Sequence, residues 1–158
     1  MGEVEDAIRR REDAVRVAHA QQEDAAEAAR QRKRSELIAN VERLTPAALE
    51  GLQRAGWPNG QLIKVDGLFR SKEIAGFVAG YFEFLDKESG PSIKSPLTLL
   101  RDGRWIWSGG GKASSFGEIV SSFAGATEKP GSRLVHELPQ GVEAALERLA
   151  DLSASRVS

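Results

Sequence analysis

The chain has 158 residues, with 22 Lys and Arg against 23 Asp and Glu, and it contains no Cys. A net charge of -1 lacks the basic excess with which dedicated nucleic-acid-binding domains neutralise phosphates, so that class drops in rank. The absence of Cys excludes disulfides, thiolate metal sites and cysteine nucleophiles. No apolar signal segment or span of membrane length occurs, so we expect a soluble cytoplasmic protein.

The composition changes near Thr45. No Phe, Tyr or Trp precedes this position, whereas all three Trp and all six Phe follow it. Only the second part can therefore build a hydrophobic core of ordinary domain size. We expect a long charged, Ala-rich helix over residues 1–44, an α+β domain over residues 45–153, and a disordered tail over residues 154–158.

Residues 3–44 contain no Gly or Pro and consist mainly of good helix formers, which predicts one long helix. A coiled-coil seam, here called the N-terminal seam, has two core positions. The first holds Val4, Arg11, Ala18 and Ala25, and the second holds Ile8, Val15, Gln22 and Ala29. Such a long helix gains little unless something packs on it, which favours self-association or a protein partner through Val4, Ile8 and Val15. The alternative is a solvated helix held by ion pairs between residues four apart.

A second apolar cluster follows at the end of this segment. It consists of Leu37, Ile38, Val41 and Leu44, and it is out of phase with the N-terminal seam. We expect this cluster to pack on the domain. Thr45 followed by Pro46 is typical of a helix start, and Gly56 is typical of a helix end, so a second, short helix is predicted between them.

The central part of the chain predicts a four-strand antiparallel meander. The expected strands cover residues 61–66, 72–86, 97–100 and 105–107. Segment 72–86 also fits helical spacing, but its β-branched and aromatic residues favour a strand, with Gly76 and Gly80 marking bulges or the close packing of a helix. Asp102 and Gly103 suit a type I′ turn between the last two strands.

Two helices and one more strand complete the prediction. Ser115-x-x-Glu118 is a capping box, and the helix behind it turns Phe116, Ile119, Val120 and Phe123 to one face. A last strand is expected over residues 133–138. Pro139 then starts a final helix, whose apolar face holds Val142, Ala145, Leu146, Leu149 and Leu152. The predicted fold is α+β, a small, mostly antiparallel sheet with helices packed on it, preceded by the long N-terminal helix.

One strand-to-helix corner has the composition of an anion site. Gly109, Gly110, Gly111 and Lys112, followed by Ser114, lie where backbone amides, a helix dipole and a Lys can converge. The run is no Walker motif, because Ala113 follows Lys112 where that motif needs Ser or Thr. A flexible connection is the more frequent role of such glycines, so a phosphate-binding or small-ligand site is the second hypothesis.

Trp105 and Trp107 share one face of their strand because they are two residues apart. They can either cover the core or form an exposed docking surface, and the core is favoured. His19 and His136 have no partner at metal spacing, and no serine elbow is present. We therefore predict no catalytic residue, metal site or cofactor.

The leading hypothesis is a non-enzymatic interaction or adaptor protein, with the helix for association and the α+β domain for partner recognition. The alternative is an enzyme or small-ligand binder that uses the Gly109 to Lys112 corner. Nucleic-acid binding through the basic cluster at residues 30–34 ranks third, since acidic residues lie within a turn or two of it.

Overall fold

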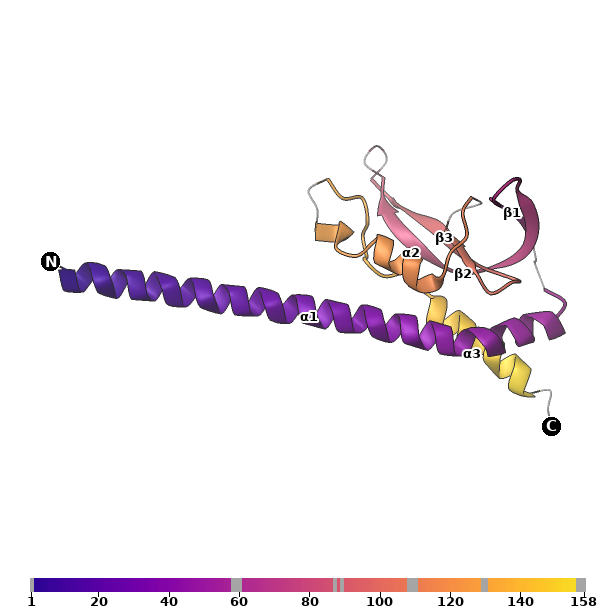
Figure 1. Ribbon diagram of the computed structural model, residues 1–158, viewed down its shortest axis with the longest axis horizontal. Coiled ribbons are helices and arrows are strands. Elements are labelled where there is room, and N and C mark those ends of the chain that lie inside the picture. Colours follow the sequence, from indigo (N-terminus) through magenta and orange to yellow (C-terminus); the bar gives the residue numbers. More distant parts are fainter. Residues whose placement is uncertain are drawn as a thin grey trace. The chain divides into compact units, whose positions relative to one another are not determined.

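The computed structural model describes residues 2–57, 61–86, 88, 90–107, 111–128 and 131–155 (Figure 1). Its elements are α1 (Gly2–Arg54), β1 (Gln61–Val65), β2 (Lys72–Leu85), β3 (Ser92–Leu100), β4 (Trp105–Trp107), α2 (Phe116–Ser122), the 3-10 turn η1 (Ala126–Glu128) and α3 (Val142–Ser155). The predicted α+β fold with a long N-terminal helix is confirmed. The chain forms two compact units, one up to Glu36 and one from Leu37 onward.

α1 continues through Pro46, so the prediction of a separate helix starting at Thr45 was wrong. Pro46 has no N–H to donate to the Glu42 carbonyl, and the hydroxyl of the preceding Thr45 makes an additional bond to the Val41 carbonyl at 2.6 Å. Burial explains why the helix does not break there. Leu37, Val41, Ala48 and Leu52 recur on one face and are all buried, so packing outweighs the lost backbone bond. The expected packing of the second apolar cluster on the domain is confirmed.

The end of α1 agrees with the prediction. Gly56 has a φ of 72°, and its amide donates to the Gln53 carbonyl at 3.2 Å. The amide of Trp57 donates to the Leu52 carbonyl at 2.9 Å. These two bonds form a Schellman motif, which satisfies carbonyls at the helix end and turns the chain toward β1.

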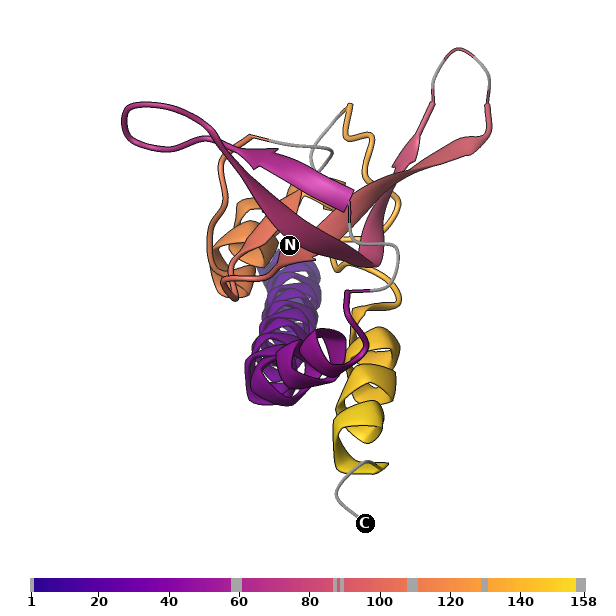
Figure 2. The same cartoon turned by 90° about the vertical axis from the view of Figure 1, so that its right-hand side faces the viewer.

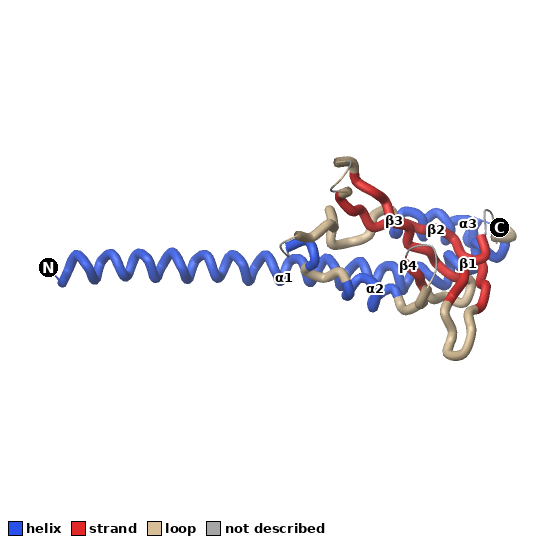
Figure 3. The backbone as a smooth tube through the Cα atoms, turned by 90° about the horizontal axis from the view of Figure 1, so that it is seen from above, coloured by secondary structure: helices blue, strands red, loops and turns tan. Residues whose placement is uncertain are grey.

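The four strands form one antiparallel sheet in the order β1-β2-β3-β4, and Figure 3 shows them side by side. Residues 72–85 are a strand, as predicted. The register with β3 shifts between Val78 and Gly80, so Ala79 is an extra residue and β2 bends there. A Cβ at Gly80 would lie 2.5 Å from the Gln140 carbonyl oxygen and would overlap a methyl group of Val142. Gly80 thus marks both a bulge and a close contact with the chain that enters α3.

The hairpin between β3 and β4 is confirmed, but its turn is not type I′. Of the two turn residues only Gly103 has a positive φ, at 91°. The Gly103 amide donates to the Leu100 carbonyl at 2.9 Å, and the Leu100 amide donates to the Arg104 carbonyl at 2.8 Å. This is a type I turn followed by a left-handed Gly, in which Asp102 needs no strained backbone.

The sheet closes on itself through residues 111–114. Ser114 exchanges two backbone bonds with Trp105 on β4, at 2.8 and 2.9 Å. Gly111 donates to the Lys64 carbonyl at 3.1 Å and accepts from the Asp66 amide at 2.7 Å, which ties the same segment to β1. The result is a small barrel. Its interior holds the buried side chains of Ile63, Val65, Leu100 and Ile106, with Ile74 and Ala113 packed against them.

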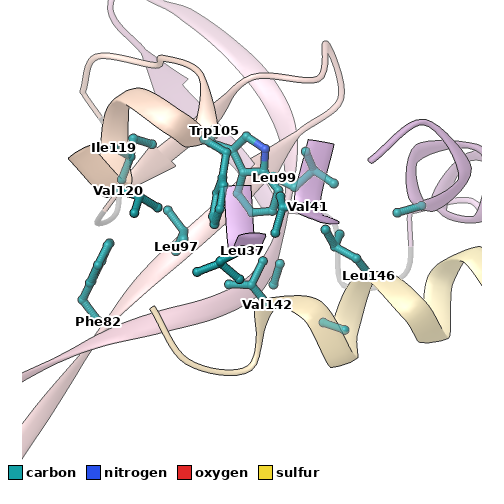
Figure 4. Packing of buried hydrophobic residues seen from close by; sticks show 14 of the residues in the cluster. Leu37, Val41, Phe82, Leu97, Leu99, Trp105, Ile119, Val120, Val142 and Leu146 are labelled. Carbon is teal, nitrogen blue, oxygen red and sulfur yellow. The ribbon is translucent and has the colours of Figure 1, made fainter. Parts of the chain in front are cut away.

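The main core lies on the other face of the sheet. The end of α1, α2 and α3 supply its helical side, and β2, β3 and β4 supply its strand side. Figure 4 shows Trp105 and Leu99 from the sheet near Val41 and Leu37 of α1. The Ser115 hydroxyl caps α2 by accepting from the Glu118 amide at 3.2 Å, and Phe116, Ile119 and Val120 are buried as predicted. Both faces of the sheet are therefore covered.

Three expectations for the last third of the chain were wrong in detail. Residues 133–138 form no continuous strand, since they contain a single isolated bridge, from Leu134 to Phe84 of β2, and a second bridge follows only at Gln140. α3 begins at Val142 and not at Pro139, after Gly141 with a φ of 82°. The apolar face of α3 is buried up to Leu149, but Leu152 is 49% exposed and Ser153 is buried instead. Of the predicted C-terminal tail, residues 156–158 lie outside the described residues.

Gly51 lets the backbones of α1 and α3 approach each other, and this contact generates a stability prediction. A Cβ at Gly51 would overlap the carbonyl oxygen of Leu149 and lie 3.0 Å from its carbon. Because that backbone cannot yield without moving α3, we expect Gly51→Ala to lower the free energy of unfolding by about 1–3 kcal/mol. Urea denaturation followed by circular dichroism measures the change.

Gly117→Ala is the matched control, because Gly117 also lies inside a helix. A Cβ there would make only an ordinary contact, 3.4 Å from a methyl group of Ile38. The gain in helix propensity, up to about 1 kcal/mol, should leave this variant as stable as the natural chain or more so. Equal destabilisation by both substitutions would contradict the proposed role of Gly51.

Candidate functional site

The loop between β1 and β2 carries the most exposed large apolar side chains of the described chain. It covers residues 66–71 and extends beyond the strand ends in Figures 2 and 3. Leu68 is 92% exposed and Phe69 is 95% exposed. Two adjacent apolar side chains in water are costly to the free protein, and such exposure is typical of contact sites.

Backbone contacts hold this loop in place at its base. The Asp66 amide donates to the Gly111 carbonyl at 2.7 Å, and Val65 faces Lys72 in the register of β1 with β2. Inside the loop the chain folds back tightly, since a Cβ at Gly67 would lie 2.5 Å from the Arg70 carbonyl oxygen. A side chain at position 67 would therefore force the loop open, and Leu68 and Phe69 sit at the tip of a defined turn.

Beneath the loop, at the mouth of the barrel, is a cavity of about 380 Å³. Barrel mouths are frequent binding sites, and this volume falls within the usual range for them. The lining combines an apolar floor from the strands, the loop itself and cationic side chains at the rim. The lining residues are Val65, Asp66, Gly67, Leu68, Phe69, Arg70, Lys72, Ile74 and Arg104. We call this set of residues the barrel mouth.

The charges of the barrel mouth are mainly positive. Arg70, Lys72 and Arg104 contribute three cations, and Asp66 is the single acid of the lining. Among the described residues neither Arg70 nor Lys72 has an ion-pair partner, so both are available to a ligand. Asp102 offsets the charge of Arg104, so Arg70 and Lys72 against Asp66 leave an excess of one positive charge at the barrel mouth. The barrel mouth is therefore suited to an apolar group that carries negative charge beside it.

Arg104 differs from the other two cations because Asp102 holds it in place. Its Nε and Nη2 lie 2.8 and 2.7 Å from one carboxylate oxygen of Asp102, and its amide donates to the other oxygen at 3.0 Å. Partial burial by itself raises the pKa of Asp102, but the bonds from Arg104 outweigh this effect and hold the pKa below its ordinary value of 3.8. Asp102 thus stays ionised and orients Arg104 at the rim of the cavity.

The two Trp residues of β4 have different environments. Trp105 is 2% exposed and packs on Phe116, with ring centres 5.1 Å apart. Trp107 is 37% exposed and packs on Phe123 and Phe84, at 5.2 and 5.8 Å. The preference for the core holds for Trp105, whereas Trp107 lies at the margin of the main core. Neither residue lines the barrel mouth.

The predicted anion corner lies only partly within the described residues. Gly109 and Gly110 fall outside them, whereas Gly111, Lys112 and Ser114 are described. The amides of Gly111 and Ser114 donate to the carbonyls of Lys64 and Trp105, so both are occupied by the closure of the barrel. Lys112 is exposed. Anion binding at this corner stays a prediction, with two of its amides already bonded.

Of the histidines, His136 lies in the segment that follows α2 and η1, beside β2, and its Nε2 is 3.6 Å from a carboxylate oxygen of Glu83. The Ser92 hydroxyl donates to the other oxygen of the same carboxylate at 2.6 Å. A serine that donates to a carboxylate is not activated by an adjacent histidine base, so this group lacks the order of a hydrolytic triad. The described residues bring together no group of three or more His, Asp or Glu that could hold a metal ion.

Sequence reasoning did not identify Leu68 and Phe69 as site residues. The available signal was a pair of large apolar residues between Gly67 and Arg70, outside the alternation of either strand. Such a pair can equally be buried under a loop, which only the tertiary structure excludes. The interaction residues that the sequence did indicate on the helix, Val4, Ile8 and Val15, are all exposed.

Comparison of the chain with protein families, with functionally described proteins and with solved structures found no significant match. Within the described ranges, no helix combines the length and the apolar composition needed to cross a membrane. The function of the protein has to be inferred from its own residues.

The pairing of Asp102 with Arg104 predicts a pH-dependent contribution to stability. Because the pKa of Asp102 is lowered on folding, its contribution is present above the ordinary pKa of 3.8 and is lost as the pH falls through the folded value. Asp102→Asn keeps the acceptor for the Arg104 amide but removes the charge. We expect a loss of less than about 1 kcal/mol at neutral pH, since the pair is partly exposed.

Urea denaturation across the acid range measures this difference. The free energies of unfolding of D102N and the natural chain should converge once the pH lies below the folded pKa. Arg104→Gln should show the same loss at neutral pH, and the double variant should lose little more than either single one. A difference that is constant over the whole pH range would refute the electrostatic explanation.

Proposed function

We propose that this chain is a non-enzymatic interaction protein that recognises a protein partner at the barrel mouth and associates through its N-terminal helix. The observation that supports recognition is the exposure of Leu68 and Phe69 beside a cavity with a cationic rim. Apolar residues that cost free energy in water are retained where a partner covers them.

The partner segment we infer carries a large apolar side chain next to carboxylates. Its apolar group would enter the cavity over Val65 and Ile74, under the side chains of the loop. Its carboxylates would lie within reach of Arg70 and Lys72, which have no ion-pair partner among the described residues. Charge complementarity of this kind speeds encounter and selects the partner, whereas burial of the apolar groups supplies most of the affinity.

Association through the helix is supported by the surface of residues 2–36. These residues form a unit of their own, and every residue from 2 to 28 is exposed. Val4, Ile8 and Val15 therefore have apolar surface that is open to a second chain. Buried apolar area drives association of helices in water, and an isolated helix with an exposed seam gains by covering it.

A random peptide library displayed on phage tests recognition at the barrel mouth, because it samples many sequences and needs no named partner. Selected peptides should share a large apolar residue close to Asp or Glu. The double substitution of Leu68→Ser and Phe69→Ser should weaken their binding at least about tenfold, because a buried apolar side chain contributes about 1.5–3 kcal/mol and about 1.4 kcal/mol is tenfold in Kd. Calorimetry with a synthetic copy of a selected peptide measures this loss.

Leu62→Ser is the control, since Leu62 is also exposed but lies on β1 outside the barrel mouth. This variant should bind the selected peptide as the natural chain does. All three substitutions replace exposed side chains, so the thermal stability should change little in either variant. Selected peptides without acidic residues, or peptides that bind the double variant unchanged, would rule out the proposed recognition.

A further inference from the structure

The N-terminal seam is uneven along the helix. Its large apolar side chains, Val4, Ile8 and Val15, lie in the first half and are exposed to 67%, 52% and 68%. The second half consists of Ala residues and Gln22. An identical helix in the same direction cannot cover such a seam evenly, because coiled-coil packing needs a side chain of matching size in each layer.

Parallel pairing in register would place each seam residue against its own copy. Arg11 would then face Arg11 inside the interface, where two like charges repel each other. Ala25 and Ala29 would also face their copies, and their methyl groups are too small to fill the space that Ile8 and Val15 need elsewhere in the same interface. The sequence of the seam therefore disfavours the parallel arrangement.

We propose that residues 4–29 pair with the same residues of a second copy in antiparallel orientation, an inference that rests on the self-association proposed above. In an antiparallel pair each layer joins one core position of the first helix with the other core position of the second. Large residues then lie opposite small ones, as close packing requires. The facing pairs are Val4 with Ala29, Ile8 with Ala25, Val15 with Ala18, and Arg11 with Gln22.

One flank of the seam supports the same arrangement. The residues that precede the second core position are small or polar, and they are Ala7, Ala14, Gln21 and Ala28. In the antiparallel register this flank meets the same flank of the second copy. Small side chains there let the two helix axes approach, so the methyl groups of Ile8 and Val15 reach the opposite backbone. Arg11 faces an amide side chain and not a second cation.

The charges select the same orientation. Arg11 is the one charged residue at the seam positions, and the antiparallel register sets it against Gln22 of the second copy. Parallel pairing would instead set Arg11 against Arg11 of the second copy. Repulsion in the wrong arrangement is enough to choose between two orientations of similar apolar contact.

Cysteine cross-linking tests the orientation, because the natural chain contains no Cys. Ile8→Cys and Ala25→Cys are prepared as two separate full-length variants. Neither should form a disulfide dimer alone, since each Cys lies about 25 Å along the helix from its own copy, at 1.5 Å per residue. An oxidised mixture of the two should form the mixed dimer, because a disulfide needs Cα atoms within about 7 Å.

Ala20→Cys mixed with Ile8→Cys is the matched control, since residue 20 lies on the outer face of the helix and should give no mixed dimer. Light scattering on the reduced proteins should give the mass of two chains. A dimer formed by Ile8→Cys alone would establish the parallel arrangement and overturn the proposal. The mass of one chain for the natural protein, or a dimer without the mixed disulfide, would overturn it as well. None of these three results would affect peptide binding at the barrel mouth, which is measured independently.

Discussion

β2 runs through the centre of the sheet with helices on one face and the barrel interior on the other, and both contacts require positions without a side chain. Gly80 lies against the chain that enters α3, and a Cβ at Gly76 would come within 2.7 Å of Thr98 and 2.8 Å of Ile63. The extra residue at Ala79 bends the strand between these two positions. The first half of β2 can therefore join the barrel while the second half carries the main core.

The position of the barrel mouth follows from this bend. β1 pairs only with the first half of β2, and residues 111–114 connect it to β4. The 66–71 loop lies at one end of this short barrel and lines the cavity there, and backbone bonds fix the base of the loop. Ile63, Val65, Leu100 and Ile106 fill the interior of the barrel, and Leu68 and Phe69 lie outside it, exposed. Their apolar surface stays in water unless a partner covers it.

The two units have different surfaces and, in the proposed function, different tasks. The helical unit carries a thin seam in which most layers join one large and one small side chain, so its pairing would be modest in strength and reversible. The barrel mouth would bind one partner segment per chain. A pair of chains would then present two barrel mouths, and a partner with two such segments would bind with higher apparent affinity without any new contact.

The helical character of α1, its end at Gly56, the Ser115 cap and the hairpin of β3 and β4 could be read from local chemistry, because each depends on neighbouring residues. Local patterns were not sufficient for all strands, since segment 72–86 also fits helical spacing and the strand predicted over residues 133–138 is absent. Contacts between distant residues decided the rest. Pro46 stays inside a helix because one face of α1 is buried against the core. The closure of the barrel at Gly111 and the exposure of Leu68 and Phe69 depend on segments far apart in the chain, and no local pattern specifies which apolar side chains a fold has room to bury.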